Sequence, residues 1–308
     1  MAVLEWIRLL RLPNQATAVA DVLAGWLIVS QARSLQWPAP AAWWAIAAGA
    51  CFYAAGMVLN DVCDVETDRR ERPERPLPSG AIALGTAATV GRGLLTAGSA
   101  AACGAAVAAG SPWPAAVGAA LTAAVWIYDR HAKATVAGPV VMGACRGLNW
   151  LVGMTAAGGP TGAHQWAIPL GMAVYVAGIT LYARDEAGRS RAALLAAGAA
   201  AMALGLAAAA AHVWLPLSAG RASFAATFQP ENWLLLWGVL GASILYRAVQ
   251  GVFDPVPARV RAAVGNAIMS IITLDAVLLL PACGPRWAIA LLCLLAVFLI
   301  GRRLVPPT

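Results

Sequence analysis

Apolar segments, each about as long as a bilayer is thick, follow one another along the chain with only short polar gaps. A membrane-spanning helix needs roughly 20 predominantly apolar residues. Ten segments meet this description: residues 14–32, 39–60, 83–109, 113–129, 137–157, 165–183, 191–215, 232–251, 261–281 and 285–301. Hydrophobic residues make up 61% of the chain, which excludes an ordinary soluble domain. The sequence therefore predicts an all-α protein, a polytopic membrane bundle of nine to ten transmembrane helices around a central cavity, with one domain over residues 1–308.

The basic residues are distributed unevenly between the two ends of these segments. With ten spans, sixteen of the 21 Lys and Arg residues fall on one side and three on the other. Cytoplasmic loops of membrane proteins carry an excess of Lys and Arg, so both termini are predicted to lie on the cytoplasmic side of the cell membrane. A count of nine would move Arg302 and Arg303 to the opposite side, which favours ten. The net charge of +7 reflects this asymmetry, and no nucleic-acid partner is predicted.

An acidic stretch directly follows the second apolar segment: residues 60–80 hold six of the fourteen acidic residues. If the helix continues past Asn60, its turn of about 100° per residue places Asn60, Asp61, Asp64 and Asp68 on one face. Glu66 points elsewhere and is expected to pair with nearby arginines in solvent. The prolines that start at Pro73 predict that the helix ends by that residue.

Acids at this spacing call for a cation, because close carboxylates raise one another's pKa unless positive charge neutralises them. Oxygen ligands one turn apart suit Mg²⁺, which binds through one or two carboxylates together with substrate phosphates. The alternative is a solvated helix end in which Asp61, Asp64 and Asp68 pair with arginines. The arginines available for this are Arg69, Arg72 and Arg75.

Two further polar clusters follow the fourth and sixth segments. Tyr128 and Lys133 combine a hydrogen-bond donor with a compact positive charge, a pair suited to phosphate. Tyr182, Asp185 and Arg189 share one helical face, although Asp185 and Arg189 are also spaced for a simple i,i+4 ion pair.

A third cluster lies inside the fifth segment, where Arg146 and Asn149 are three residues apart and share a face. An arginine within a membrane span is costly and indicates a functional site. Asp21 and Asp275 are isolated acids in other spans, so Arg146 could instead pair with one of them.

The segment Asn60-Asp61-x-x-Asp64-x-x-x-Asp68, followed by Arg72 and Pro76-Leu77-Pro78-Ser79-Gly80, resembles the first aspartate-rich motif of the UbiA superfamily of intramembrane prenyltransferases. Residues 128–133 are similar to the family's tyrosine and lysine motif. Residues 182–189 are similar to its second aspartate motif, except that Arg189 stands where an aspartate belongs. Residues 145–149, Cys-Arg-Gly-Leu-Asn, resemble the EboC-like branch of the superfamily.

The resemblance implies Mg²⁺-dependent transfer of a prenyl group from an isoprenoid diphosphate to an unidentified acceptor in the membrane. The metal ligands it implies are Asn60, Asp61, Asp64, Asp68 and Asp185. The catalytic residues are Asp64, Asp68, Lys133 and Asp185, and the substrate-binding residues are Arg72, Tyr128, Arg146, Asn149, Tyr182 and Arg189. Two alternatives remain open: a cation-coupled transporter, and a catalytically silent UbiA-like scaffold.

Overall fold

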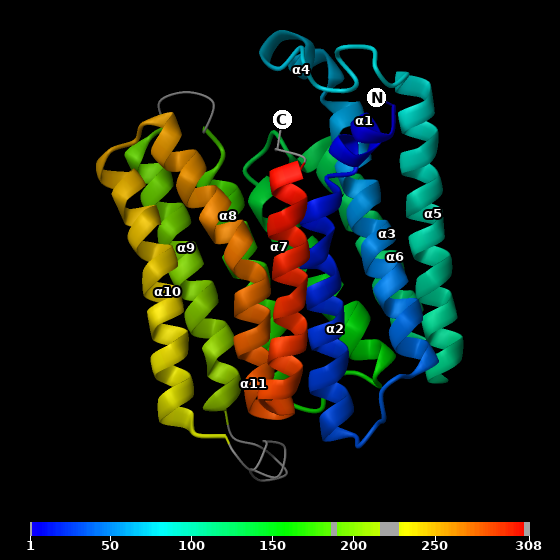
Figure 1. Ribbon diagram of the computed structural model, residues 1–308, viewed down its shortest axis with the longest axis vertical. Helices are drawn as coiled ribbons and strands as arrows, with labels where there is room; N and C mark the ends of the chain where they lie inside the picture. Colours follow the sequence, from blue (N-terminus) through cyan, green and yellow to red (C-terminus); the bar gives the residue numbers. More distant parts are fainter. Residues whose placement is uncertain (1, 186–189, 216–227, 305–308) are drawn as a thin grey trace.

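The computed structural model describes residues 2–185, 190–215 and 228–304, and within these ranges the regular structure is entirely helical (Figure 1). The α-helices are α1 (Ala2–Leu9), α2 (Gln15–Ala32), α3 (Pro40–Cys63), α4 (Val65–Glu71), α5 (Leu84–Ala109), α6 (Trp113–Ile127), α7 (Gly138–Ala156), α8 (Ala163–Tyr182), α9 (Ala192–Ala210), α10 (Pro230–Phe253) and α11 (Pro257–Leu304). Three short turns complete the set: η1 (Leu12–Asn14), the π-helical η2 (Tyr128–Ala132) and η3 (Ala211–Val213). The predicted all-α fold is confirmed.

Each of the ten predicted segments coincides with a long helix, except that α11 contains the last two. The helix breaks at Gly284, where φ is 74°, a backbone conformation that favours glycine. Figure 1 shows the chain reversing direction at the break. Among the described helices, seven are long and apolar enough to cross a membrane, with α11 counted once. The cavity predicted between the helices stays a prediction.

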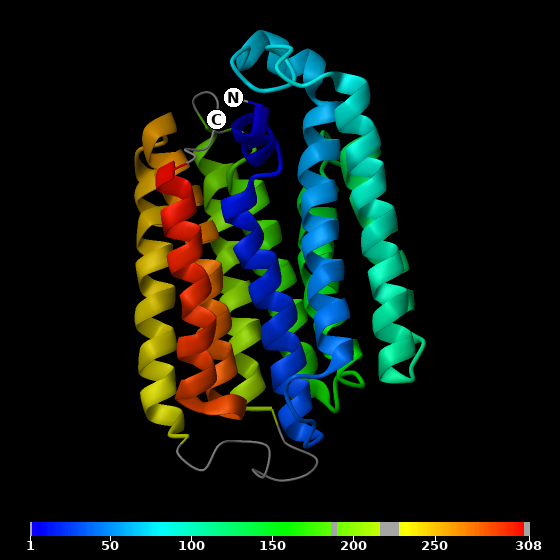
Figure 2. The same cartoon turned by 45° about the vertical axis from the view of Figure 1, so that its right-hand side comes forward.

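Helix α2 occupies the middle of the bundle and packs against α3, α7 and α11 (Figures 1 and 2). Small residues permit this close approach. Helices in a bilayer associate through such close packing, because the hydrophobic effect does not favour contacts between helices there. At Gly153 of α7, a Cβ atom would lie 2.0 Å from the carbonyl oxygen of Val22 in α2. The two backbones are therefore in direct contact, and α2 and α7 have little freedom to shift.

We expect Gly153→Ala to destabilise the protein by about 2 kcal/mol, because the added methyl group forces α7 away from α2. Thermal unfolding in detergent measures the change. Gly238→Ala in α10 is the matched control, since no atom lies within 4 Å of the point that an added Cβ would occupy, and alanine favours a helix over glycine. Equal stability of the two variants would contradict the close packing of α2 against α7.

Candidate functional site

The acidic stretch forms a bent helix end. Helix α3 ends at Cys63 and α4 begins at Val65, but helical backbone bonds continue across the bend: the Asp64 amide donates to Asn60 and the Asp68 amide donates to Asp64, at 3.0 and 2.9 Å. Helix α4 ends at Glu71, so the predicted end before Pro73 is confirmed. Figure 2 shows α4 and α1 at the same end of the bundle.

Lys133 joins two of the predicted metal ligands. Its Nζ donates a hydrogen bond of 2.7 Å to Asn60 Oδ1 and forms an ion pair with Asp64 Oδ2. The π-helical turn η2 places the lysine here, and such turns are frequent at functional sites. Two oxygens, a carboxamide and a carboxylate, thus converge on a single positive charge.

Asp129 and Tyr128 of η2 lie beside this lysine. The Asp129 carboxyl is half-buried and interacts electrostatically with Lys133 and Asp64. Its Oδ2 atom has no hydrogen-bond partner. Asp129 was not among the residues predicted from the sequence, although its position four residues before Lys133 could have indicated a shared helical face.

Asp61 and Asp68 face a different pair of cations. Arg75 Nη1 lies 2.8 Å from Asp68 Oδ2 and 3.8 Å from Asp61 Oδ1, and Arg11 Nη2 lies 3.0 Å from the same Asp61 oxygen. Both acids are buried. Arg11, which was also not predicted, precedes η1 in a left-handed conformation with φ of 44°.

The four acidic-stretch ligands therefore divide into two groups. Asn60 and Asp64 contact Lys133, whereas Asp61 and Asp68 contact arginines, as the alternative interpretation allowed for Arg75. In the described parts of the chain, no three His, Cys, Asp or Glu side chains converge as a metal site. The division follows helical geometry. At about 100° per residue around the helix axis, Asp64 lies about 40° from Asn60, whereas Asp68 and Asp61 lie about 80° and 100° from it. Glu66 pairs with Arg69 in solvent, as predicted.

Arg146 and Asn149 of α7 form a separate cluster with residues of α2. Arg146 Nε is 2.7 Å from Asp21 Oδ2, and Asn149 Nδ2 donates 2.9 Å hydrogen bonds to the same oxygen and to the Ala18 carbonyl. Arg146 also donates to Thr17. Arg146 and Asn149 therefore contact α2 and not Lys133. The predicted alternative, an ion pair between Arg146 and Asp21, is present.

The residues at the end of α8 also take other partners. The Tyr182 hydroxyl donates to the Ala248 carbonyl in α10 at 2.8 Å, so the tyrosine joins two helices where a substrate contact was predicted. Asp185 Oδ2 lies 3.1 Å from Arg191 Nε. Arg189 lies outside the described residues. Arg72 is half-buried at the end of α4, one turn beyond Asp68.

We expect Tyr182→Phe to lower stability by about 1 kcal/mol, the usual net contribution of one buried hydrogen bond. Because the hydroxyl is engaged by Ala248, the KM for a diphosphate substrate should not change. Thermal unfolding and steady-state kinetics measure the two quantities. An increased KM at unchanged stability would instead support the predicted contact between Tyr182 and the substrate.

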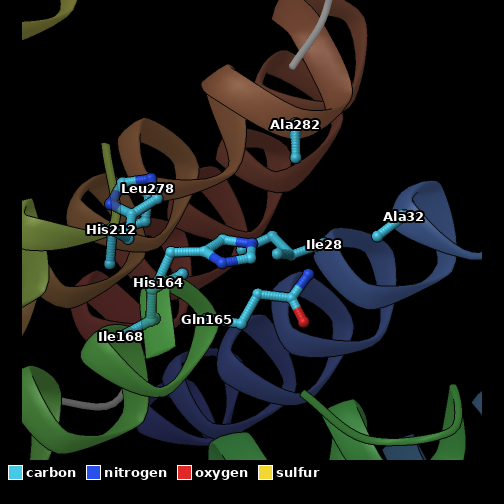
Figure 3. Close-up of a pocket in the computed structure, with 8 residues that line it drawn as sticks. All are labelled: Ile28, Ala32, His164, Gln165, Ile168, His212, Leu278 and Ala282. Atoms are coloured by element: carbon cyan, nitrogen blue, oxygen red, sulfur yellow. The ribbon is translucent and has the colours of Figure 1, made fainter. Parts of the chain in front are cut away.

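A small cavity lies at the opposite end of the bundle, between α2, α8, the turn η3 that follows α9, and the first half of α11. Figure 3 shows the side chains around it, among them His164, Gln165 and His212. Its enclosed space is about the size of one water molecule. The cavity is therefore distinct from the acidic site.

Residues 18–270 match the sequence model of the UbiA prenyltransferase family. The chain belongs to this family. The match begins inside α2, extends to the first part of α11 and includes Asn60, Asp64 and Lys133. It ends before the break at Gly284.

Curated relatives of this UbiA family chain include three archaeal proteins named digeranylgeranylglyceryl phosphate synthase. The protein of Metallosphaera sedula is 51% identical over 45 residues, that of Methanoculleus marisnigri is 36% identical over 98 residues, and that of Sulfolobus acidocaldarius is 32% identical over 87 residues. These matches cover 15%, 32% and 28% of this chain. The chain spans a third or less of the length of these relatives, between 16% and 33%. The predicted EboC-like placement stays a prediction.

Solved structures share the fold over most of the chain. A structure described in work on the biosynthesis of digeranylgeranylglyceryl phosphate synthase in membranes superimposes with a TM-score of 0.64 at 19% identity, covering 91% of this chain and 98% of that one. A UbiA homologue from Archaeoglobus fulgidus, bound to GPP and Mg²⁺, gives 0.59 at 15% identity, covering 89% and 99%. These likenesses establish the arrangement of helices.

Proposed function

We propose that this UbiA family protein transfers a prenyl group from an isoprenoid diphosphate to an acceptor in the membrane, in a reaction that requires Mg²⁺. The observation that carries the proposal is the convergence of Asn60 Oδ1 and Asp64 Oδ2 on the Lys133 ammonium. The Archaeoglobus fulgidus homologue bound to GPP and Mg²⁺ supports the choice of donor and metal.

The residues at this end of the bundle fit a hard cation. Mg²⁺ prefers oxygen ligands and usually binds through one or two carboxylates, with water and substrate phosphate completing its shell. Asn60 and Asp64 supply oxygens that already face one positive charge. Asp129, whose Oδ2 has no hydrogen-bond partner, interacts electrostatically with Asp64 and Lys133. We propose that Asn60 and Asp64 hold the metal, with Asp61, Asp68 and Asp185 in support. When bound, Mg²⁺ neutralises charge that develops on the leaving diphosphate.

The chain's own cations complete the neutralisation. Lys133 is partly exposed, with a third of its side-chain surface accessible, so it can turn from Asp64 to a diphosphate oxygen. Arg72 lies beside the same bent helix end and can bind the remaining charge. Fixed positive charges of this kind stabilise the leaving group as the bond between carbon and oxygen breaks. The apolar helices then exclude water, which would otherwise capture the allylic cation before the acceptor does.

We propose that this site lies on the cytoplasmic side of the cell membrane, because cytoplasmic loops carry an excess of basic residues. The acidic stretch, Lys133 and the arginines at both chain ends belong to the same basic side of the predicted topology. A water-soluble diphosphate would thus approach from the cytoplasm, while its prenyl tail enters between the helices.

Purified protein incubated with Mg²⁺ and labelled allylic diphosphates of several chain lengths tests the proposal. Geranylgeranylglyceryl phosphate and a cell lipid extract serve as acceptor sources, the first because of the names of the archaeal relatives. We expect Mg²⁺-dependent diphosphate release and a lipid-soluble product, both abolished by chelation. If the protein shows no turnover and binds no donor at any chain length, the proposal is refuted. Cation movement across liposomes without donor binding would instead support a transporter.

A further inference from the structure

A second group of charged side chains, separate from the cluster around Lys133, lies deep between α2, α7 and α11. Asp21 and Asp275 are completely buried, and the Arg146 side chain is only 8% exposed. Asp21 lies two helical turns beyond Asn14, at the start of α2, so the group sits well inside a predicted membrane span. Buried charges at such depth are costly and are retained only when paired or functional.

The hydrogen bonds of this group are incomplete. Asp21 Oδ2 accepts from Asn149 and faces Arg146, but Asp21 Oδ1 and both oxygens of Asp275 have no donor. Asp275 faces the Asp21 carboxyl, and the Arg146 charge also acts on it. Tyr53 of α3 interacts with Asp21 and Arg146. Tyr175 of α8 is also close, yet its hydroxyl donates to the Ala267 carbonyl at 2.9 Å.

The charges of the group do not balance if both acids are ionised. Two carboxylates and one guanidinium leave a net charge of −1 in the hydrocarbon interior, where an uncompensated charge is strongly unfavourable. Two carboxylates are also acceptors only, so they cannot hydrogen-bond to each other. One added proton removes both problems, because it neutralises the group and turns the contact between the acids into an O–H···O⁻ hydrogen bond.

We propose that Asp21 and Asp275 share one proton and, with Arg146, form a neutral proton-binding site inside the bundle. The shared proton links α2 to α11, two helices far apart in sequence. Its loss would place two like charges between these helices and weaken their packing. The site is distinct from the cluster of Asn60, Asp64 and Lys133, since the polar partners of Asp21 are Arg146 and Asn149.

Infrared spectroscopy of the purified protein at neutral pH tests the proposal directly. A protonated carboxylic acid has a C=O stretching band separate from that of carboxylates, and this band shifts when the acid proton exchanges for deuterium. We expect such a band in the difference spectrum between the wild type and Asp275→Asn, which removes the contribution of any other protonated acid. Asp254→Asn is the matched control: Asp254 lies just before α11, is exposed and pairs with Arg259, so this variant should keep the band.

Thermal unfolding of two variants adds a second test. Asparagine at position 275 is neutral and can donate to Asp21, as a protonated acid does, so Asp275→Asn should keep Tm within about 2 °C of the wild type. Asp275→Leu cannot donate and should lower Tm by about 4 °C or more. A wild type without the acid band, or a Tm that rises with added Na⁺ at constant ionic strength, would refute the shared proton; the second result would indicate a bound metal cation.

Discussion

Replacing Asp64 by alanine is expected to reduce prenyl transfer about 1,000-fold or more, because this carboxylate is proposed to hold Mg²⁺ against the donor diphosphate. Asp64 contacts both Lys133 and Asn60, so its removal takes away one of the two oxygens that converge on the lysine. The effect is measured as kcat/KM for the donor, with Mg²⁺ titrated at each donor concentration. A loss that saturating Mg²⁺ does not restore identifies a requirement in the transition state.

Glu66→Ala provides the control for this experiment. Glu66 lies two residues from Asp64 and its replacement removes the same charge, but its side chain is 71% exposed and pairs with Arg69. We expect the kcat/KM of this variant to stay within about twofold of the wild type, as for most surface changes. If both variants lost activity equally, the effect would come from net charge and not from a metal ligand.

Lys133→Gln is expected to lower kcat/KM for the donor about 100-fold, through loss of a positive charge that faces the diphosphate. The alternative is that Lys133 merely occupies the cation position when Mg²⁺ is absent. In that case Lys133→Gln would lower the Mg²⁺ concentration needed for half-maximal activity and leave kcat/KM at saturating Mg²⁺ unchanged. Steady-state kinetics over a Mg²⁺ titration distinguishes the two roles.

Arg130→Gln is the matched control for the lysine. Arg130 belongs to the same π-helical turn, but it is exposed and stacks over the Trp126 ring at 4.6 Å. We expect this variant to retain normal kinetics. A comparable loss in Arg130→Gln would show that the charge of the turn matters as a whole.

The helices could be predicted from sequence because hydropathy is a local property. The segments 261–281 and 285–301 were separated correctly, since Gly284 lies between two apolar runs, and the structure reverses direction at that residue. The bend at Asp64 was not predicted, because the acidic spacing alone is compatible with a straight helix. Helical backbone hydrogen bonds nevertheless continue past Asn60, so the angles predicted from the spacing still describe the order of the acids around the helix.

The site was predictable in its residue types but not in its pairings. Asn60 and Lys133 are 73 residues apart, and their contact depends on how α3 packs against η2. In the same way, Arg146 was recognised as exceptional, but only the packing of α7 on α2 selects Asp21 as its partner. The direction of the Tyr182 hydroxyl depends on α10, which no local pattern describes.

The reversal at Gly284 also determines what a tag attached to the protein would report. The returning half of α11 brings Gly301 against Pro13, so the last described turn of the chain lies beside its first helices. A reporter fused to either terminus would then lie in the same compartment as Lys133. A fluorescent protein and a periplasmic phosphatase, fused in turn to each end, would give matching readings, and a truncation at residue 284 would invert the reading at the new carboxyl terminus.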